Sequence, residues 1–331
     1  MTVAIQFYIP LNEEAFSSLP TSINDYWEWQ LTALGISQNW GQYHWVVQTY
    51  IHLKASGLNV ILTNKLPHEG ILITHRDCLK YDFIPTNNLF VVVLLVDRDV
   101  PLPYAQLHVT HNPVQKLHLG QPYFYMPPWP QIGLIPRDTK RGEIFTNIVY
   151  HGYSENLDEK LRENDFLESI QKLGLSITYS PPAHWHDFSH ADVILAIRKL
   201  GIQEQYLNKP SLKLYNAWLA GVPAIMGYET SYRAEGKINV NYIEATSTQD
   251  VLDALKKLKQ NPSLVKELVD AGKKSVELFS TTQTVEKWHD FLAKVIIPRH
   301  NAWLHSRSKQ MTHRILSRFR TKILWRYPGW F

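Results

Sequence analysis

The sequence predicts an α/β protein made of two doubly wound domains that face each other across a cleft. A length of 331 residues is enough for two domains. Short β-rich runs alternate with helical stretches in two successive series, and a segment with five prolines and four aromatic residues, 120–138, separates them. Hydrophobic residues make up 44% of the chain and charged residues 19%, which is typical of a packed globular protein and excludes a disordered one.

The first series forms the predicted N-terminal domain, residues 1–138, which includes the proline-rich linker. Apolar residues near helical spacing predict a helix over 43–56 that ends at Gly57. Runs such as 89–96 are apolar throughout, which indicates strands buried on both faces of a parallel sheet. Strands are expected at 3–9, 59–63, 70–75, 89–96 and 105–110.

The second series forms the predicted C-terminal domain, residues 139–297. Strands are expected at 144–152, 175–179, 191–197, 223–227 and 239–245, and helices at 156–174, 211–221, 248–260, 262–279 and 282–296. Pro262 suits the first turn of its helix, where a missing N–H costs nothing. Ligands of such sheets bind at the carboxyl ends of the strands, so the cleft would hold two substrates.

The chain carries no sequence signal for export or for crossing a membrane. Cys78 is the only cysteine, so a disulfide within the chain is excluded. No run of 18 apolar residues occurs, and the first residues lack the basic start and long apolar core of a signal peptide. We therefore expect a cytoplasmic protein.

Residues 208–225 carry a specific resemblance. They read Asn-Lys-Pro-Ser-Leu-Lys-Leu-Tyr-Asn-Ala-Trp-Leu-Ala-Gly-Val-Pro-Ala-Ile. This segment resembles the donor-binding core of GT-B glycosyltransferases, and its Lys-Leu-x-Asn-Ala part is similar to α-1,3-fucosyltransferases and to a group of bacterial and cyanobacterial nucleotide-sugar transferases. The resemblance covers roughly 144–292. It implies two facing Rossmann-like domains and transfer of a hexose or deoxyhexose from a nucleotide-sugar donor, held by the C-terminal domain, to an unidentified acceptor.

The residues around this segment suit a nucleoside diphosphate. A helix N-terminus offers free N–H groups and the positive end of a dipole, and cations stabilise the phosphate as it leaves. A glycine after the first strand of the domain lets the backbone approach a phosphate, and a carboxylate after a later strand can accept ribose hydroxyls. The candidates are Gly152, Arg198, Lys209, Ser211, Lys213 and Asn216 for the diphosphate or nucleotide, and Glu229 for the ribose. The competing interpretation is surface charge on an ordinary α/β turn.

One departure from the resembled pattern leaves the stereochemistry open. Many retaining GT-B enzymes have two glutamates eight positions apart in this segment. Asn208 and Asn216 stand there in this chain. An inverting enzyme instead needs a general base on the acceptor hydroxyl, and strand-end loops of the N-terminal domain would supply it. In order of preference, the candidates are Asp77, His75, Glu14 and His111.

Metal chemistry has weaker support. Asp97 and Asp99 follow an apolar strand, and such a pair binds a divalent cation in GT-A transferases, the alternative class. The histidines of 184–190 do not have the spacing of a structural zinc site. We therefore expect no metal and no cofactor beyond the nucleotide-sugar substrate. A second alternative is a non-catalytic protein that binds a nucleotide or sugar at a membrane surface.

The C-terminal tail, 298–331, differs in charge from the rest of the chain. Residues 299–331 contain eight Lys and Arg and no acidic residue, whereas the remainder sums to −4. Apolar residues recur at helical spacing between the cations. This pattern predicts a basic amphipathic helix that lies on an anionic membrane, on the inner face, or packs back on the body. Nothing in the body indicates a nucleic-acid groove.

Overall fold

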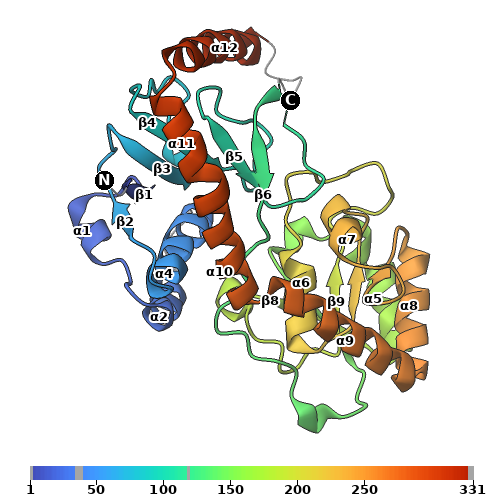
Figure 1. The fold of residues 1–331 in the computed structure, drawn as a ribbon. Coiled ribbons are helices and arrows are strands. Elements are labelled where there is room, and N and C mark those ends of the chain that lie inside the picture. Colours follow the sequence, from blue (N-terminus) through green and yellow to red (C-terminus); the bar gives the residue numbers. More distant parts are fainter. Residues whose placement is uncertain (1–2, 34–39, 118–119, 327–331) are drawn as a thin grey trace. The chain divides into compact units, whose positions relative to one another are not determined.

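A computed structural model describes residues 3–33, 40–117 and 120–326 (Figure 1). The chain forms two compact units, one made of residues 1–127 and 284–331 and the other of 128–283. Each unit is built on one parallel β-sheet. The predicted α/β class with two parallel-sheet domains is therefore confirmed.

The sheet of the first unit has six strands in the order β2-β1-β3-β4-β5-β6, all parallel. Its central strand β4 is buried along its whole length, as the apolar run 89–96 predicted. The strands are β1 (Ile5–Tyr8), β2 (Val60–Thr63), β3 (Gly70–His75), β4 (Leu89–Leu94), β5 (Leu107–Thr110) and β6 (Tyr123–Tyr125). The helices before β2 are α1 (Glu13–Ser17), α2 (Ile23–Ala33), α3 (Trp40–Gln42) and α4 (Gln48–Ala55), and a π-helical turn, Tyr43–Val47, leads into α4.

The sheet of the second unit has five parallel strands in the order β11-β10-β9-β7-β8. Pro262 stands at the start of α9, where Asn261 accepts a hydrogen bond from the Leu264 N–H, as the sequence predicted. The strands are β7 (Asn147–His151), β8 (Ser176–Ser180), β9 (Val193–Ala196), β10 (Ala224–Met226) and β11 (Ile243–Glu244). The helices are α5 (Asn164–Lys172), α6 (Leu212–Ala220), α7 (Thr230–Glu235), α8 (Thr248–Gln260) and α9 (Pro262–Val276).

The C-terminal residues return to the first unit through α10 (Thr281–Asp290), a π-helical turn at Phe291–Ile296, α11 (Ile297–Leu304) and α12 (Arg307–Arg326). The Phe291 ring stacks on Phe124 of β6 at 4.4 Å, and Trp303 Nε1 donates to the Asn87 carbonyl at 2.8 Å. These contacts explain why residues 284–331 group with the first sheet, whereas the sequence placed 139–297 in one domain and 298–331 in a separate tail.

Two local expectations differ from the structure. The linker 120–138 contains the sixth strand of the first sheet, because Pro122 and Pro127 flank β6 and leave its backbone free to pair with β5. The helix predicted over 156–174 is wrong in its first half and begins only at α5. Asp158 lies in the loop between β7 and α5, and its carboxylate accepts hydrogen bonds from the Lys160 and Leu200 N–H groups. These bonds hold the stretch that follows Asp158 in a 3-10 turn, Glu159–Leu161.

Candidate functional site

The predicted donor residues gather at the carboxyl edge of the second sheet. Gly152 follows β7, Arg198 follows β9 and Glu229 follows β10, while Lys213 lies in the first turn of α6. Parallel strands end at one edge of a sheet, so residues that are far apart in the chain meet there. We call Arg198, Lys209, Lys213 and Glu229 the donor cluster.

Within the donor cluster, Arg198 and Glu229 form an ion pair whose carboxylate is buried. Arg198 Nε lies 3.1 Å from Glu229 Oε1, and the Glu229 side chain is 1% exposed. Burial raises the pKa of Glu229, against the opposing charges of Arg198, Lys213 and Lys209. One buried carboxylate therefore stands among three cations, and the net charge of the cluster is positive.

Lys213 is the most perturbed cation of the cluster. Burial and the charge of Arg198 lower its pKa to about 7, although Glu229 acts in the opposite direction. Its ammonium lies 4.3 Å from the ring centroid of Tyr150, a cation–π contact. An added anion would favour the charged form of Lys213 and raise this pKa again.

Gly152 leaves room for this ammonium. A Cβ at position 152 would lie 2.8 Å from Tyr150 Oη and 2.9 Å from Lys213 Nζ. A side chain there would push at least one of these two atoms away. The Lys213 ammonium therefore lies against Gly152, the position where the sequence predicted close approach of the backbone to a phosphate.

The two predicted polar residues of α6 are buried. Ser211 is 0% and Asn216 7% exposed. Among the described residues, the Ser211 hydroxyl and the Asn216 Oδ1 have no hydrogen-bond partner. Buried polar atoms are usually satisfied, so both atoms can take a hydrogen bond from a ligand or water. Within the described parts of the chain, no hydrogen bond or ion pair joins Asn216 to the donor cluster.

Two tyrosines complete the cluster and were missed from the sequence. Tyr150 lies under Lys213, and the Tyr206 ring lies 5.9 Å from the Arg198 guanidinium. Tyr206 has φ +49°, a left-handed conformation that costs a non-glycine residue free energy. A strained residue beside a charged cluster is typical of functional sites. Nothing in the sequence marks Tyr150 or Tyr206 as the partner of a buried cation.

The first-choice base candidate, Asp77, lies in an ion pair after β3. Arg98 Nε lies 3.0 Å from each of its carboxylate oxygens, and Arg76 lies at 3.6 Å. Burial alone would raise the pKa of Asp77, but the hydrogen bonds from Arg98 and the charges of His75, Arg98 and Arg76 hold it below its usual range. Nothing in the sequence marks Arg98 as the partner of Asp77, because 21 residues separate the two.

His75 lies beside Asp77 and is 3% exposed. Its Nδ1 accepts the Asp77 N–H at 3.2 Å, so the neutral ring carries its proton on Nε2. Burial lowers the pKa of His75, which favours that neutral ring. The structure therefore brings Asp77 and His75 together as predicted, but uses one nitrogen of His75 to hold the backbone.

The other two base candidates lie in different surroundings. His111 is 3% exposed and packs on Trp45 at a ring distance of 4.2 Å, and burial lowers its pKa to about 3. Glu14 is exposed on α1. In the stretches that the structure describes, no ion pair or side-chain hydrogen bond links Glu14 to Asp77 or His75.

The metal candidates do not form a cluster of ligands. Among the described residues, no group of three or more His, Cys, Asp and Glu side chains could hold a metal ion, and this applies to Asp97, Asp99 and 184–190 alike. Asp97 has φ +55°, and its charge acts on His75 and Arg98.

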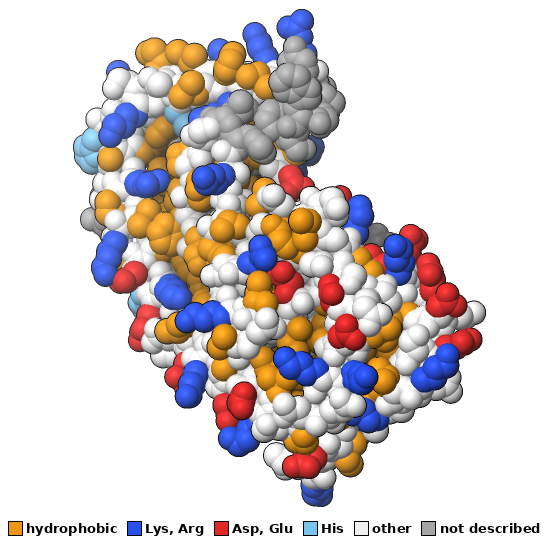
Figure 2. Space-filling view, turned by 90° about the vertical axis from the view of Figure 1, so that its right-hand side faces the viewer, with side chains coloured by type: hydrophobic (Ala, Val, Ile, Leu, Met, Phe, Trp, Pro, Cys, Tyr) orange, Lys and Arg blue, Asp and Glu red, His pale blue; other side chains and the backbone are white. Residues whose placement is uncertain are grey.

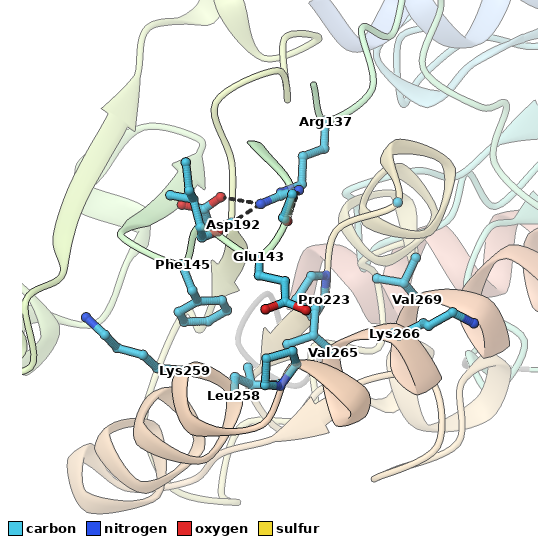
Figure 3. Close-up of a pocket in the computed structure, with 14 residues that line it drawn as sticks. Arg137, Glu143, Phe145, Asp192, Pro223, Leu258, Lys259, Val265, Lys266 and Val269 are labelled. Atoms are coloured by element: carbon cyan, nitrogen blue, oxygen red, sulfur yellow. Dashed lines mark hydrogen bonds and ion pairs between the residues drawn. The ribbon is translucent and has the colours of Figure 1, made fainter. Parts of the chain in front are cut away.

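A cavity of about 280 Å³ lies at the opposite, amino-terminal edge of the second sheet (Figure 3). Asp192, at its wall, is fully buried and pairs with Arg137 at 2.9 Å and Arg141 at 2.6 Å. The same carboxylate accepts the N–H groups of Thr146 and Asn147. These contacts fasten 137–147 to β9, so the polar groups of the cavity serve the fold, and ligands of parallel sheets bind at the other edge.

The sequence matches no protein-family model and no curated protein. Solved structures do match the fold. HepE from Anabaena, crystallised with UDP and glucose, is 9% identical with a TM-score of 0.52, and the match covers 89% of this chain and all of HepE.

Two further structures match less closely. The pneumococcal O-GlcNAc transferase GtfA, in complex with UDP and GlcNAc, is 13% identical with a TM-score of 0.48, over 76% of this chain and 60% of GtfA. Sucrose-phosphate synthase from Thermosynechococcus elongatus is 11% identical with a TM-score of 0.48, over 69% of this chain and 74% of the synthase. The chain thus spans about 60% of the length of GtfA. The match to HepE, together with the two parallel sheets, gives this chain the fold of GT-B glycosyltransferases.

Proposed function

We propose that the chain is a glycosyltransferase that moves a sugar from a nucleotide-activated donor to an acceptor hydroxyl. The donor cluster carries this proposal, because it sets three cations around one buried carboxylate at the edge where such sheets bind ligands. The leaving nucleoside diphosphate gains negative charge as its bond to the sugar breaks, and preorganised cations stabilise that charge. UDP bound to HepE supports a uridine diphosphate donor. The transfer of a hexosyl or deoxyhexosyl group rests on the resemblance of residues 208–225.

In this proposal Lys213, Lys209 and Arg198 hold the diphosphate. The Ser211 hydroxyl and the Asn216 side chain lie on the same helix or at its start, and they add hydrogen bonds to the nucleotide. Glu229 was expected at the ribose. Its pairing with Arg198 at 3.1 Å and its 1% exposure favour a positioning role toward Arg198 instead.

For the acceptor step, Asp77 remains our first choice as general base. Its side chain is 25% exposed, whereas that of His75 is 3% exposed, so Asp77 is the more accessible of the pair. The backbone bond to His75 Nδ1 leaves a proton on Nε2, which cannot accept another. Arg98 would have to release part of its hold on Asp77 when the acceptor binds.

No step of this proposal uses a metal. Transfer should therefore persist in excess chelator. A loss of activity that added Mg²⁺ or Mn²⁺ restores would favour the alternative, a metal-dependent reaction through Asp97 and Asp99.

The first test is nucleotide binding by calorimetry with uridine, guanosine and adenosine diphosphates. Lys213→Ala should weaken binding of the nucleotide that the wild-type chain prefers by roughly 10- to 100-fold, the range for a charge-assisted contact. Lys256→Ala is the matched control, because Lys256 is an exposed lysine of α8 in the same unit. Unchanged affinity in Lys213→Ala would remove Lys213 from the phosphate site.

The second test separates an enzyme from a protein that only binds nucleotides. Hydrolysis of, or transfer from, any UDP-sugar by the wild-type chain, lost in Lys213→Ala and kept in Lys256→Ala, supports the transferase. Tight nucleotide binding with no turnover of any nucleotide sugar would favour the non-catalytic alternative.

A further inference from the structure

Helix α12 packs on the first unit through polar side chains. Gln310 Nε2 donates to the Asn87 carbonyl at 3.2 Å, and His313 Nε2 lies 3.3 Å from the Ala105 carbonyl. We call these inward-facing residues, Gln310, His313, Ser317 and Arg320, the packing face of α12. They recur every three or four positions and so lie on one side of the helix.

The other side of α12 exposes large apolar side chains. Met311 is 64%, Ile315 62% and Phe319 58% exposed, and neighbouring Leu316 is 43% exposed. We call these four residues the apolar stripe. At about 100° per residue, Met311, Ile315 and Phe319 lie roughly 180° around the helix from the centre of the packing face, and Leu316 lies at the edge of the stripe. A surface helix normally buries its apolar side and exposes its polar side, so α12 is inverted.

Cations border the stripe and also point outward. Exposed on α12 are Arg307, Lys309, Arg314, Arg318, Lys322 and Arg326. At the top of Figure 2, where α12 lies, hydrophobic side chains stand beside Lys and Arg side chains. Residues 299–331 contain no Asp or Glu to balance these charges. The outer face of α12 is therefore both apolar and strongly positive.

We infer that the outer face of α12 docks on the surface of a bilayer that contains anionic lipids. Such a surface matches both properties, because headgroups attract the cations and the acyl boundary takes up the apolar side chains. A second copy of this chain would bring like charges together at the stripe, and a nucleic acid would leave the stripe in water. Among the described helices, none is long and apolar enough to span a membrane.

The test is co-sedimentation of the full chain with two kinds of vesicle, phosphatidylcholine alone and phosphatidylcholine with phosphatidylglycerol. We expect binding to the second kind only. Each basic residue near an anionic surface contributes about fivefold to the partition coefficient, so Arg314→Gln with Arg318→Gln should lower it roughly 30-fold. Lys256→Gln with Lys257→Gln is the control, because it removes the same charge from exposed positions of α8 and should change nothing.

The apolar stripe is tested separately. Phe319→Ser should lower partition about tenfold, including the part that survives high salt, because salt screens charges and does not remove apolar burial. Leu278→Ser is its control, since Leu278 is 63% exposed in the second unit. All these positions are exposed, so melting temperatures should stay close to that of the wild type.

Three outcomes would overturn the inference. The first is that the wild-type chain does not bind vesicles at low salt. The second is that the control variants lose as much vesicle partition as the α12 variants. The third is that the chain binds no vesicles but forms a concentration-dependent dimer, which Phe319→Ser dissociates. The outer face of α12 belongs to the first unit and the donor cluster to the second, so nucleotide affinity should be the same in every α12 variant. Failure here would therefore leave the proposed transferase untouched.

Discussion

The carboxyl edges of the two sheets are built from similar residues and differ in charge balance. In the second unit, three cations surround Glu229, and desolvation together with the charge of Arg198 lowers the pKa of Lys213 to about 7. In the first unit, Asp77 is bound by Arg98 and its pKa lies below its usual range. The carboxyl edge of the second sheet therefore carries excess positive charge. At the carboxyl edge of the first sheet, Arg98 balances the charge of Asp77.

This difference matches two different ligands. A cluster with excess positive charge gains most from binding an anion. Burial destabilises the charged forms of its cations, and a bound anion stabilises them. A balanced edge gains little from an anion and suits a neutral ligand such as a sugar hydroxyl. We therefore expect the nucleotide at the second sheet and the acceptor at the first.

The largest effect is expected at the balanced edge. Asp77→Asn should lower turnover about 100-fold or more, because the amide cannot accept the acceptor proton, while nucleotide affinity stays unchanged. The measurement is steady-state transfer together with nucleotide calorimetry. Glu28→Gln is the control, because Glu28 is an exposed acid of α2 in the same unit and is not a base candidate. Near-normal turnover in Asp77→Asn would remove the base from this position, and a parallel loss of nucleotide affinity would contradict the division between the edges.

A smaller effect is expected from Gly152→Ala at the positive edge. The new Cβ would meet Lys213 Nζ and Tyr150 Oη below 3 Å, so the ammonium must move. Nucleotide affinity should fall about tenfold, as for a weakened charge-assisted contact. The melting temperature should fall as well, because the buried ring of Tyr150, whose Cζ would lie 2.9 Å from the new Cβ, must also shift. Affinity is therefore measured well below the melting temperatures of both proteins. Gly41→Ala is the control, since its Cβ would make only ordinary contacts, from 3.8 Å outward, in the first unit. Unchanged affinity would show that the ammonium position does not matter.

The smallest effect is the pH dependence of nucleotide binding. The pKa of Lys213 is lowered to about 7 by burial and by Arg198, so the ammonium is present below that pH and is lost as pH rises through it. Affinity should therefore fall roughly fivefold between pH 7 and pH 8, as the charged fraction falls. The second ionisation of a phosphate lies near pH 6, so the nucleotide keeps its charge over this interval.

Calorimetry at the two pH values measures this, and Lys213→Ala supplies the control. The variant should show a weaker affinity that no longer depends on pH between 7 and 8. A slope that persists in Lys213→Ala would assign the titration to another group of the cluster.

Short-range patterns in the sequence were enough to predict most of the fold. The apolar run 89–96 marked buried β4, Pro262 marked the first turn of α9, and Gly57 marked the end of α4, where its φ is +88°. Each feature depends on the residues of one element alone. The positions of Gly152 and Arg198 at one edge also followed, because parallel strands must end together.

Only the tertiary structure decided which residues touch across long separations. Tyr150 under Lys213 and Arg98 on Asp77 join different elements, and no local pattern marks such pairs. The tail shows the same limit. Its sequence predicts an amphipathic helix, but the polar face of α12 is the one that packs. The carbonyls of Asn87 and Ala105, more than 200 residues away in the chain, can accept hydrogen bonds from the Gln310 and His313 side chains. Apolar side chains could not donate to these carbonyls.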